Sequence, residues 1–200
     1  YLTYGGLYRE VWLEATAESR LTDLFVYTPT LQEAVVQWTA ELTPAAAAVR
    51  IRLETAEGTL LAEQTAPAAE TGKMQLSVPE AQPWDTEHPV LHHAVAELLN
   101  AAGQPIDRKQ VTFGFRTAEF RADGFYLNGK KTFLRGLNRH QSYPYIGYAA
   151  PESLQREDAR ILQEELHCTA VRTSHYPDDP YFLQLCDEYG LYVIGETNLE

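Results

Sequence analysis

The sequence predicts a multidomain chain in which an all-β domain precedes an α/β domain. Before residue 117, apolar and polar residues alternate in short runs, which is the period of strands buried on one face. After residue 117, short apolar runs alternate with segments of helical period, which is the pattern of repeated β/α units. The change of period near residue 117 therefore marks the expected boundary between two fold classes.

Residues 15–117 are expected to form an immunoglobulin-like β-sandwich of seven antiparallel strands. VRIRLE (49–54), MQLSV (74–78) and VTFGFR (111–116) each place apolar side chains on one face of a strand. The connections ELTPAAAA, ETAEG and NAAGQP contain the Gly, Pro and small polar residues typical of short turns. His92 and His93 fall in this region, and we expect the pair on a strand surface rather than in a metal site.

Residues 1–14 precede the sandwich and are harder to assign. GLYREVWLEA has the alternation of a strand, yet no hairpin partner follows it in the adjacent sequence. We therefore interpret residues 1–14 as the last strand of a preceding domain.

Residues 118–200 are expected to begin an α/β domain. FYLNGKKTF centres on Asn128 and Gly129, a strong signal for a type I′ hairpin because both residues tolerate positive φ. Three apolar segments follow, and they predict parallel strands that are buried on both faces. These segments are TFLRGLN, TAVRTS and LYVIGE.

Two segments between these strands carry helical signals. PESLQREDARILQEEL (151–166) has one apolar stripe. The stripe consists of Leu154, Ile161, Leu162 and Leu166. YFLQLCDEY follows Asp179 and Pro180, which suit an N-cap and a first helical position, and Gly190 follows it at the expected C-cap.

Polar clusters follow each of the three predicted parallel strands. They occupy residues 138–141, 172–175 and 196–200. In a β/α barrel the reactive groups lie at the carboxyl ends of the strands, whereas a nucleotide-binding sheet has a glycine-rich loop there. Because no such loop follows these strands, the pattern argues against nucleotide binding and indicates a site at the strand ends.

Composition excludes several classes of partner. The net charge is −12 with only 16 Lys and Arg, which disfavours nucleic acid and anionic membranes, since both need a cationic surface. No apolar run approaches the ~20 residues that cross a bilayer. The two cysteines, Cys168 and Cys186, do not form a disulfide scaffold and are expected to be buried thiols. We therefore expect a cytoplasmic protein that binds a neutral or cationic ligand.

Four motifs carry a family resemblance. GLNRHQ (136–141), VRTSHYP (171–177), CDEYGLYVIGE (186–196) and the closing TNLE resemble the start of the catalytic barrel in family 2 glycoside hydrolases. This family includes bacterial β-galactosidases and β-glucuronidases, and its layout is a jelly-roll sugar-binding domain, an immunoglobulin-like sandwich and a TIM barrel. The resemblance thus implies that the chain begins with the last jelly-roll strand and ends within a truncated barrel, since a complete one takes about 250 residues.

Details of the motifs favour one branch of the family. NRH and ETNLE are more similar to β-galactosidases than to β-glucuronidases, which tend to have lysine in place of Arg139. Thr169 is a departure, because the family usually has asparagine there, but it lies at the start of a strand, away from the ligand end. The resemblance implies a retaining β-galactosidase that hydrolyses terminal β-D-galactosides, with β-glucuronidase as the alternative.

The resemblance also implies roles for the strand-end residues. In the family, the acid/base and the nucleophile are glutamates at the ends of barrel strands four and seven, so both are expected beyond Glu200 and the 200-residue chain alone is expected to be inactive. Arg172 would hold the nucleophilic carboxylate, and His140 and His175 would contact sugar hydroxyls. Glu200 matches a magnesium-ligand position, which implies Mg²⁺ in the full-length enzyme. The substrate-binding or supporting residues are Asn138, Arg139, His140, Arg172, His175, Glu196 and Asn198.

Structural roles for these residues remain open on the sequence alone. Arg172 could belong to a structural ion pair, and each histidine could be a core residue bonded to a backbone carbonyl. A second class of function also remains open, in which the sandwich is a non-catalytic sugar-binding or assembly module. The expected partners are a β-galactoside, the remaining domains of the same polypeptide and a second copy in a homo-oligomer.

Overall fold

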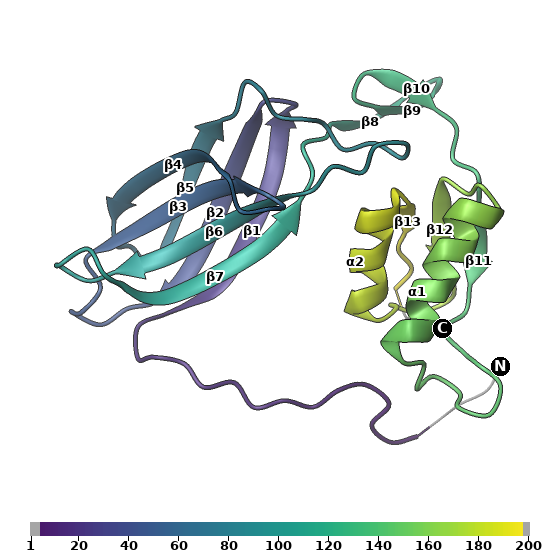
Figure 1. Ribbon diagram of the computed structural model, residues 1–200, viewed down its shortest axis with the longest axis horizontal. Coiled ribbons are helices and arrows are strands. Elements are labelled where there is room, and N and C mark those ends of the chain that lie inside the picture. Colours follow the sequence, from purple (N-terminus) through teal and green to yellow (C-terminus); the bar gives the residue numbers. More distant parts are fainter. Residues whose placement is uncertain (1–4, 198–200) are drawn as a thin grey trace. The chain divides into compact units, whose positions relative to one another are not determined.

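The structure is a computed structural model that describes residues 5–197, and it separates into two compact units (Figure 1). One unit comprises residues 14–84 and 90–131. Within the described residues, the other comprises 5–13, 85–89 and 132–197. Residues 118–131 thus group with the sandwich, although the sequence motifs place the start of the α/β region at 118.

The first unit is a sandwich of two antiparallel sheets. One sheet has the strand order β1 (Arg20–Thr30), β2 (Glu33–Glu41) and β5 (Thr71–Ser77). The other has the order β4 (Leu60–Pro67), β3 (Ala48–Thr55), β6 (His92–Leu99) and β7 (Pro105–Phe113). This arrangement confirms the predicted immunoglobulin-like sandwich, whose strands the period-two pattern located.

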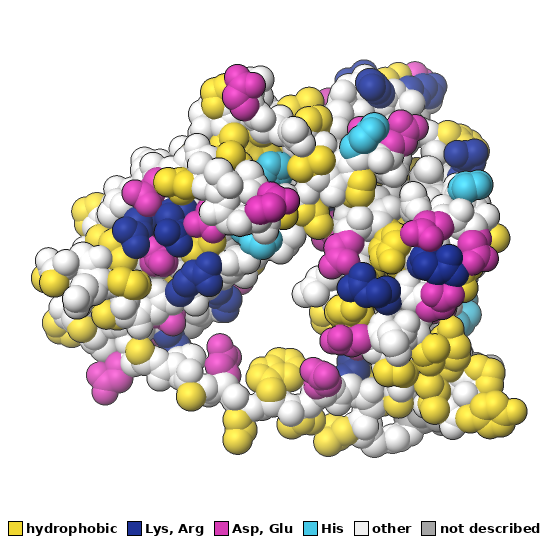
Figure 2. All heavy atoms as spheres, viewed as in Figure 1, with side chains coloured by type: hydrophobic (Ala, Val, Ile, Leu, Met, Phe, Trp, Pro, Cys, Tyr) yellow, Lys and Arg dark blue, Asp and Glu magenta, His cyan; other side chains and the backbone are white. Residues whose placement is uncertain are grey.

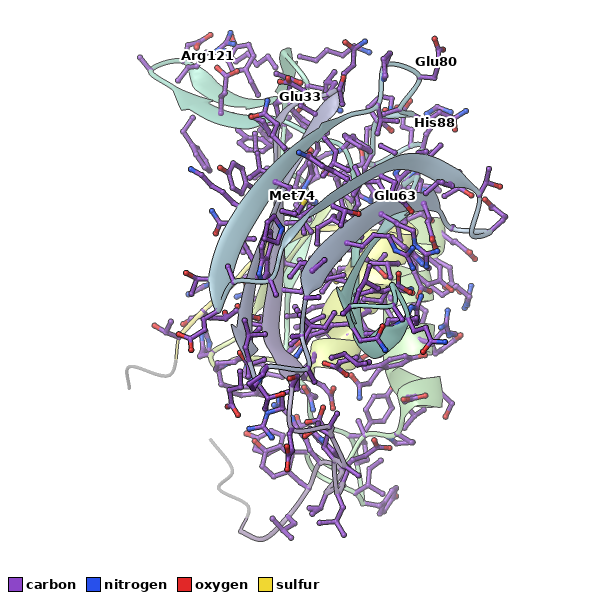
Figure 3. The ribbon with its side chains drawn as sticks, turned by 90° about the vertical axis from the view of Figure 1, so that its left-hand side faces the viewer. Glu33, Glu63, Met74, Glu80, His88 and Arg121 are labelled. Carbon is purple, nitrogen blue, oxygen red and sulfur yellow. The ribbon has the colours of Figure 1, made fainter. Side chains whose placement is uncertain are left out.

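The sandwich core is formed by the alternating apolar residues. Val49, Ile51 and Leu53 of β3 have no exposed surface. Met74, which lies among the sandwich strands in Figure 3, is 5% exposed. Burial of each such side chain stabilises the fold by ~1.5–3 kcal/mol relative to exposure. The predicted inward faces of the segments 49–54 and 74–78 are therefore correct.

His92 differs from its predicted position on a strand surface. Its side chain is buried, and its ring lies 5.9 Å from that of Phe113 and 5.0 Å, edge to face, from that of Phe115. The strand alternation turns His92 inward and leaves His93 partly exposed. The expectation of two surface histidines is therefore wrong for His92.

A hairpin meander ends this unit. It consists of β8 (Ala118–Arg121), β9 (Gly124–Leu127) and β10 (Lys130–Thr132). Asn128 and Gly129 connect β9 to β10 with φ of 49° and 75°, which are the two positive values that a type I′ turn requires. The predicted hairpin is confirmed.

The second unit contains a parallel three-stranded sheet. Its order is β11 (Gly136–Arg139), β12 (Ala170–Thr173) and β13 (Tyr192–Ile194). Helix α1 (Glu152–Arg160), continued by a π-helical turn over Ile161–Glu165, connects β11 to β12, and α2 (Pro180–Tyr189) connects β12 to β13. The β/α alternation is as predicted.

The ends of α2 follow the predicted capping signals. Asp179 Oδ1 accepts a hydrogen bond of 2.9 Å from the backbone N–H of Tyr181, and Pro180 is the first helical residue. Gly190 ends the helix in the left-handed region at φ 72°, where a Cβ atom would also lie 2.7 Å from the carbonyl oxygen of Thr86. Both the conformation and the space therefore require glycine.

Burial in this unit is less complete than the sequence predicts. Val171 of β12 is fully buried, but Leu137 of β11 is 52% exposed and Ile194 of β13 is 49% exposed. These two strands are the edges of the sheet, and the described residues do not cover their outer apolar side chains. Leu166 is also 52% exposed because the chain leaves the α-helical path at the π-helical turn. Within the described residues β11 and β13 are therefore not buried on both faces, and the prediction of Leu166 on the buried stripe is wrong.

The strand expected within residues 1–14 is not seen in the part of this segment that the structure describes. Residues 5–17 have no regular secondary structure, and no described strand pairs with them. A strand needs a hydrogen-bonded neighbour, so alternation alone does not produce one. The origin of this segment in a jelly-roll domain remains a prediction.

The surface of the two helices carries charges of both signs. Figure 2 shows basic and acidic side chains intermixed over α1 and α2, as in the ion pair between Arg156 and Glu188.

Cys168 and Cys186 are buried free thiols, as predicted, and burial raises the pKa of Cys186 to about 12. Among the described residues, the helices are all too short or too polar to cross a membrane.

Candidate functional site

The candidate site lies at the carboxyl ends of the three parallel strands. The register pairs Asn138 of β11 with Arg172 of β12, and Arg172 with Ile194 of β13. The residues that follow these positions therefore emerge at one edge of the sheet. This geometry brings the predicted polar clusters together.

Glu196 contacts three other residues of the candidate site. Its Oε2 atom lies 2.8 Å from Nη2 of Arg172, and its Oε1 atom lies 3.1 Å from Nδ1 of His175. Its backbone N–H donates a hydrogen bond of 3.1 Å to Oγ1 of Thr173. The side chains of Arg172, His175 and Glu196 are 43%, 33% and 23% exposed, so a ligand can reach them.

The contact with Glu196 determines the tautomer of neutral His175. A carboxylate only accepts hydrogen bonds, so Nδ1 of His175 must carry the hydrogen that it donates. In the neutral imidazole, Nε2 is then left as an acceptor. A carboxylate behind an imidazole therefore prepares its far nitrogen to accept a hydrogen bond from a hydroxyl group.

His140 lies beside this cluster. Its ring centroid is 5.3 Å from that of His175, in an edge-to-face arrangement, and its Nδ1 atom is 3.5 Å from Oη of Tyr176. Tyr176 accepts a hydrogen bond of 3.0 Å from the backbone N–H of Gln141. Burial raises the pKa of Tyr176 to about 12, so the phenol remains protonated at neutral pH.

Arg139 lies away from this exposed cluster, in a buried ion-pair network. Its Nε atom donates to Asp158 at 2.9 Å, and its Nη1 atom donates to Asp178 at 2.6 Å. The guanidinium carbon also lies 3.8 Å from the centroid of the Phe182 ring. The side chain is only 6% exposed, so Arg139 is enclosed by its partners rather than open to a ligand.

Asp178 is a member of the site region that the sequence interpretation did not single out. Its side chain is fully buried, and its Oδ1 atom accepts no hydrogen bond from the described residues. Burial raises the pKa of Asp178, and the adjacent Arg139 lowers it. The two aspartates of the motif HYPDDP were the available signal, but only the fold shows that Asp178 faces Arg139 whereas Asp179 caps α2.

The structure says less about the other predicted site residues. Asn138 is exposed on β11 beside Arg172. Asn198 and Glu200 lie outside the described residues, so the Mg²⁺ site at Glu200 remains a prediction. Within residues 5–197, no group of three or more His, Cys, Asp and Glu side chains has the arrangement of a metal site.

Together these groups suit a ligand rich in hydroxyl groups. A sugar hydroxyl both donates and accepts hydrogen bonds, and the cluster offers an imidazole acceptor, a carboxylate and a guanidinium donor. The arrangement can therefore bind and orient a sugar. Retaining hydrolysis additionally needs two carboxyl groups about 5 Å apart, a nucleophile and an acid/base.

Comparison with protein families covers nearly the whole chain. The family model described as "Glycosyl hydrolases family 2" matches residues 19–116. The model described as "Glycosyl hydrolases family 2, TIM barrel domain" matches residues 118–200. The two matches correspond to the two fold classes.

Individual relatives agree with these matches. The chain is 38% identical to a protein named beta-galactosidase from Thermoanaerobacter pseudethanolicus, over 98% of this chain and 28% of the relative. It is 54% identical to beta-galactosidase from Thermoanaerobacterium thermosulfurigenes, over 56% of this chain and 16% of the relative. Among solved structures, apo beta-glucuronidase 3 from Bacteroides uniformis has a TM-score of 0.84 and 29% identity, over 96% of this chain and 25% of that one. The chain thus spans less than a third of the length of these proteins.

Proposed function

The chain belongs to family 2 of the glycosyl hydrolases, and we propose that it forms part of a retaining glycosidase that hydrolyses terminal β-D-galactosides. The observation that carries this proposal is the cluster of Arg172, His175 and Glu196 at the strand ends, with His140 beside it. These residues lie at the carboxyl ends of the strands or in the loops that follow them, where β/α barrels hold their substrates.

In this proposal the two histidines bind sugar hydroxyls. Glu196 fixes the orientation of His175 through Nδ1, so Nε2 accepts from a hydroxyl group of the substrate. His140 supplies a second imidazole next to it. Contacts that strengthen as the ring flattens toward an oxocarbenium ion accelerate the reaction, because they stabilise the transition state more than the substrate.

Arg172 has a different role in this proposal. Its contact with Glu196 involves Nη2, whereas a guanidinium carries five N–H donors in all. The 43% exposed side chain therefore has donors to offer to a second carboxylate. We infer that it holds the nucleophilic glutamate ionised, since a neighbouring cation lowers the pKa of a carboxyl group.

A β-glucuronidase is the second candidate, favoured by the solved structure from Bacteroides uniformis that this chain resembles. A glucuronide carries a carboxylate, which a protein normally binds with a cation. Of the two arginines at the described strand ends, Arg139 is buried between carboxylates of the chain, and the donors of Arg172 that Glu196 leaves are assigned above to the nucleophile. This pairing favours a neutral galactoside.

Further features of the whole protein are also proposals. We infer that the acid/base and the nucleophile belong to segments beyond Glu200, so that the 200-residue polypeptide alone does not hydrolyse substrate. Mg²⁺ at Glu200, assembly with the remaining domains and homo-oligomerisation remain predictions. The free thiols of Cys168 and Cys186 support a cytoplasmic location.

Hydrolysis of chromogenic substrates tests the proposed function. A polypeptide extended to the length of the relatives should cleave a β-galactoside at least ~10²-fold more efficiently than the matching β-glucuronide, a preference of ~2.7 kcal/mol in transition-state binding. The initial product should be the β-anomer by NMR. A preference for the glucuronide would establish the alternative, and cleavage by the 200-residue chain at a comparable rate would refute the inferred place of the catalytic carboxyl groups.

A further inference from the structure

An arginine outside the β/α sequence contacts the loop that carries His175. Nη2 of Arg9 donates a hydrogen bond of 3.0 Å to the carbonyl oxygen of Pro177. Nε of the same side chain lies 3.8 Å from Oδ2 of Asp179. Because the Arg9 segment has no regular secondary structure, these side-chain contacts tie it to loop 174–179, the connection between β12 and α2.

An aromatic series runs from the same segment to both histidines. The ring of Tyr8 lies 6.0 Å from that of Tyr148, which lies 5.3 Å from that of Tyr176. Tyr176 lies 6.0 Å from His140, and His140 lies 5.3 Å from His175. Tilted and edge-to-face rings at such distances attract one another. Tyr8 and Arg9 thus contact the site region by two separate routes.

The opposite side of the loop is fixed by β11 and the residues after it. Arg139 of β11 forms the buried ion pair with Asp178, and Gln141 Oε1 accepts a hydrogen bond of 2.7 Å from the backbone N–H of Asp179. Asp179 in turn caps α2 through Oδ1. The loop therefore has internal anchors at two consecutive aspartates, whereas Arg9 contacts it at Pro177 and at the other oxygen of Asp179.

We propose that Arg9 is a positioning residue for loop 174–179, acting through Pro177 and Asp179 on the placement of His175. This proposal rests on the proposed glycosidase function for its catalytic consequence. Displacements of about 1 Å in a group that orients substrate can lower a rate by up to ~10²-fold. Arg9 does not touch the reacting atoms, so its effect depends on the geometry of the loop.

Kinetics of the extended enzyme provide one test. Arg9→Met keeps much of the side-chain stem but removes both polar contacts, and we expect it to lower kcat/KM for a β-galactoside about 10-fold, mainly through kcat. Arg9→Lys should recover part of the loss, because an ammonium retains the charge and one donor. Arg156→Met is the matched control: Arg156 bridges α1 and α2 through Glu188 and Tyr181, so its loss should leave kcat/KM within twofold.

The imidazole resonances of His175 provide a second test that needs no activity. In the 200-residue chain, Arg9→Met should shift the ¹H–¹³C signals of His175 and His140, and Arg156→Met should leave them unchanged. If His175 signals and kinetics both match those of the unmodified protein, or if Arg9→Met and Arg156→Met act alike, the proposal is overturned. Inactivity of the unmodified enzyme toward galactosides would sink the proposed function, while the NMR comparison would still decide the role of Arg9.

Discussion

Each of the two units contains an arginine–glutamate pair, in opposite surroundings. In the sandwich, Arg50 and Glu97 face each other in the middle of β3 and β6, with Nη2 and Oε2 2.6 Å apart and the Glu97 side chain 7% exposed. In the β/α unit, Arg172 at the end of a strand contacts Glu196 at 2.8 Å, and their side chains are 43% and 23% exposed. The chemistry of the two pairs is the same, but access to them differs.

Position along the strand explains this difference. The carboxylate of Glu97, within the sheet, is enclosed by neighbouring side chains such as Arg52, which approaches it at 3.6 Å, although Arg50 itself is 27% exposed. A pair at the strand ends faces a loop region and keeps donors for a ligand. We therefore propose a structural role for the first pair and a functional role for the second.

Protection against hydrogen exchange should show the largest contrast between the units. β3 has completely buried apolar residues and pairs on both sides, whereas β13 is an edge strand with Ile194 49% exposed. In the 200-residue polypeptide, amides of β3 should therefore exchange about 10³-fold or more slowly than those of β13. Limited proteolysis should likewise cut residues 132–197 before the sandwich. Equal protection of both units in a monomer would contradict the comparison.

Removal of Arg172 should mainly affect catalysis. In the extended enzyme, Arg172→Ala should lower kcat for a β-galactoside by about 10²-fold or more, since the nucleophile would lose a cation worth ~2.7 kcal/mol in the transition state. Single-turnover and steady-state rates should both fall, because glycosylation and deglycosylation use the same carboxylate. Thr169→Asn, at the opposite end of the strand, is the control and should leave the rates nearly unchanged. Normal kcat in a folded Arg172→Ala protein would contradict the catalytic role and show that Arg172 has a structural one.

Removal of Arg50 should have the reverse effect. Arg50→Ala leaves the buried carboxylate of Glu97 with weaker contacts, and we expect the free energy of unfolding of the sandwich to fall by ~1–3 kcal/mol. The kcat of the extended enzyme should stay within twofold at temperatures where the variant is folded. Urea unfolding, followed by tryptophan fluorescence, measures the free energy of unfolding. No loss of stability would show that the sandwich does not depend on the pair of Arg50 and Glu97.

A smaller effect is expected from pH. Burial lowers the pKa of His92, as does the neighbouring charge of His93, while Glu57 opposes the shift. The unfolded state therefore binds a proton at higher pH than the folded state, so sandwich stability should decrease as pH falls below about 6.5, the ordinary histidine pKa. His92→Leu should reduce this acid-side decrease in urea titrations. An unchanged slope would show that other groups cause it.

Local signals in the sequence were sufficient where the structure depends on neighbouring residues in the chain. The turn at Asn128 and Gly129 and the caps at Asp179 and Gly190 follow from backbone preferences, and all were predicted correctly. The alternation in residues 49–54 similarly located the buried face of β3. In each case a short segment contains its own physical cause.

Features that depend on residues distant in the sequence were harder to predict. Alternation suggested a strand around Arg9, but no described strand pairs with it. The exposure of Ile194 depends on which elements cover β13, and the interior position of Arg139 depends on Asp158 and Asp178 meeting it in the fold. The strand-end cluster was foreseen as a group, because parallel strands bring their ends together, but its pairwise contacts were not.

Binding of a galactose-configured transition-state mimic tests the central claim about the strand-end cluster most directly. Calorimetry on the extended enzyme should compare this mimic with galactose itself, in the unmodified protein and in His175→Ala. We expect the variant to bind the mimic about 10-fold or more weakly, a loss of ~1.4 kcal/mol, with a smaller loss for galactose. If a folded His175→Ala protein binds the mimic with unchanged affinity, the cluster of Arg172, His175 and Glu196 is not the proposed sugar site.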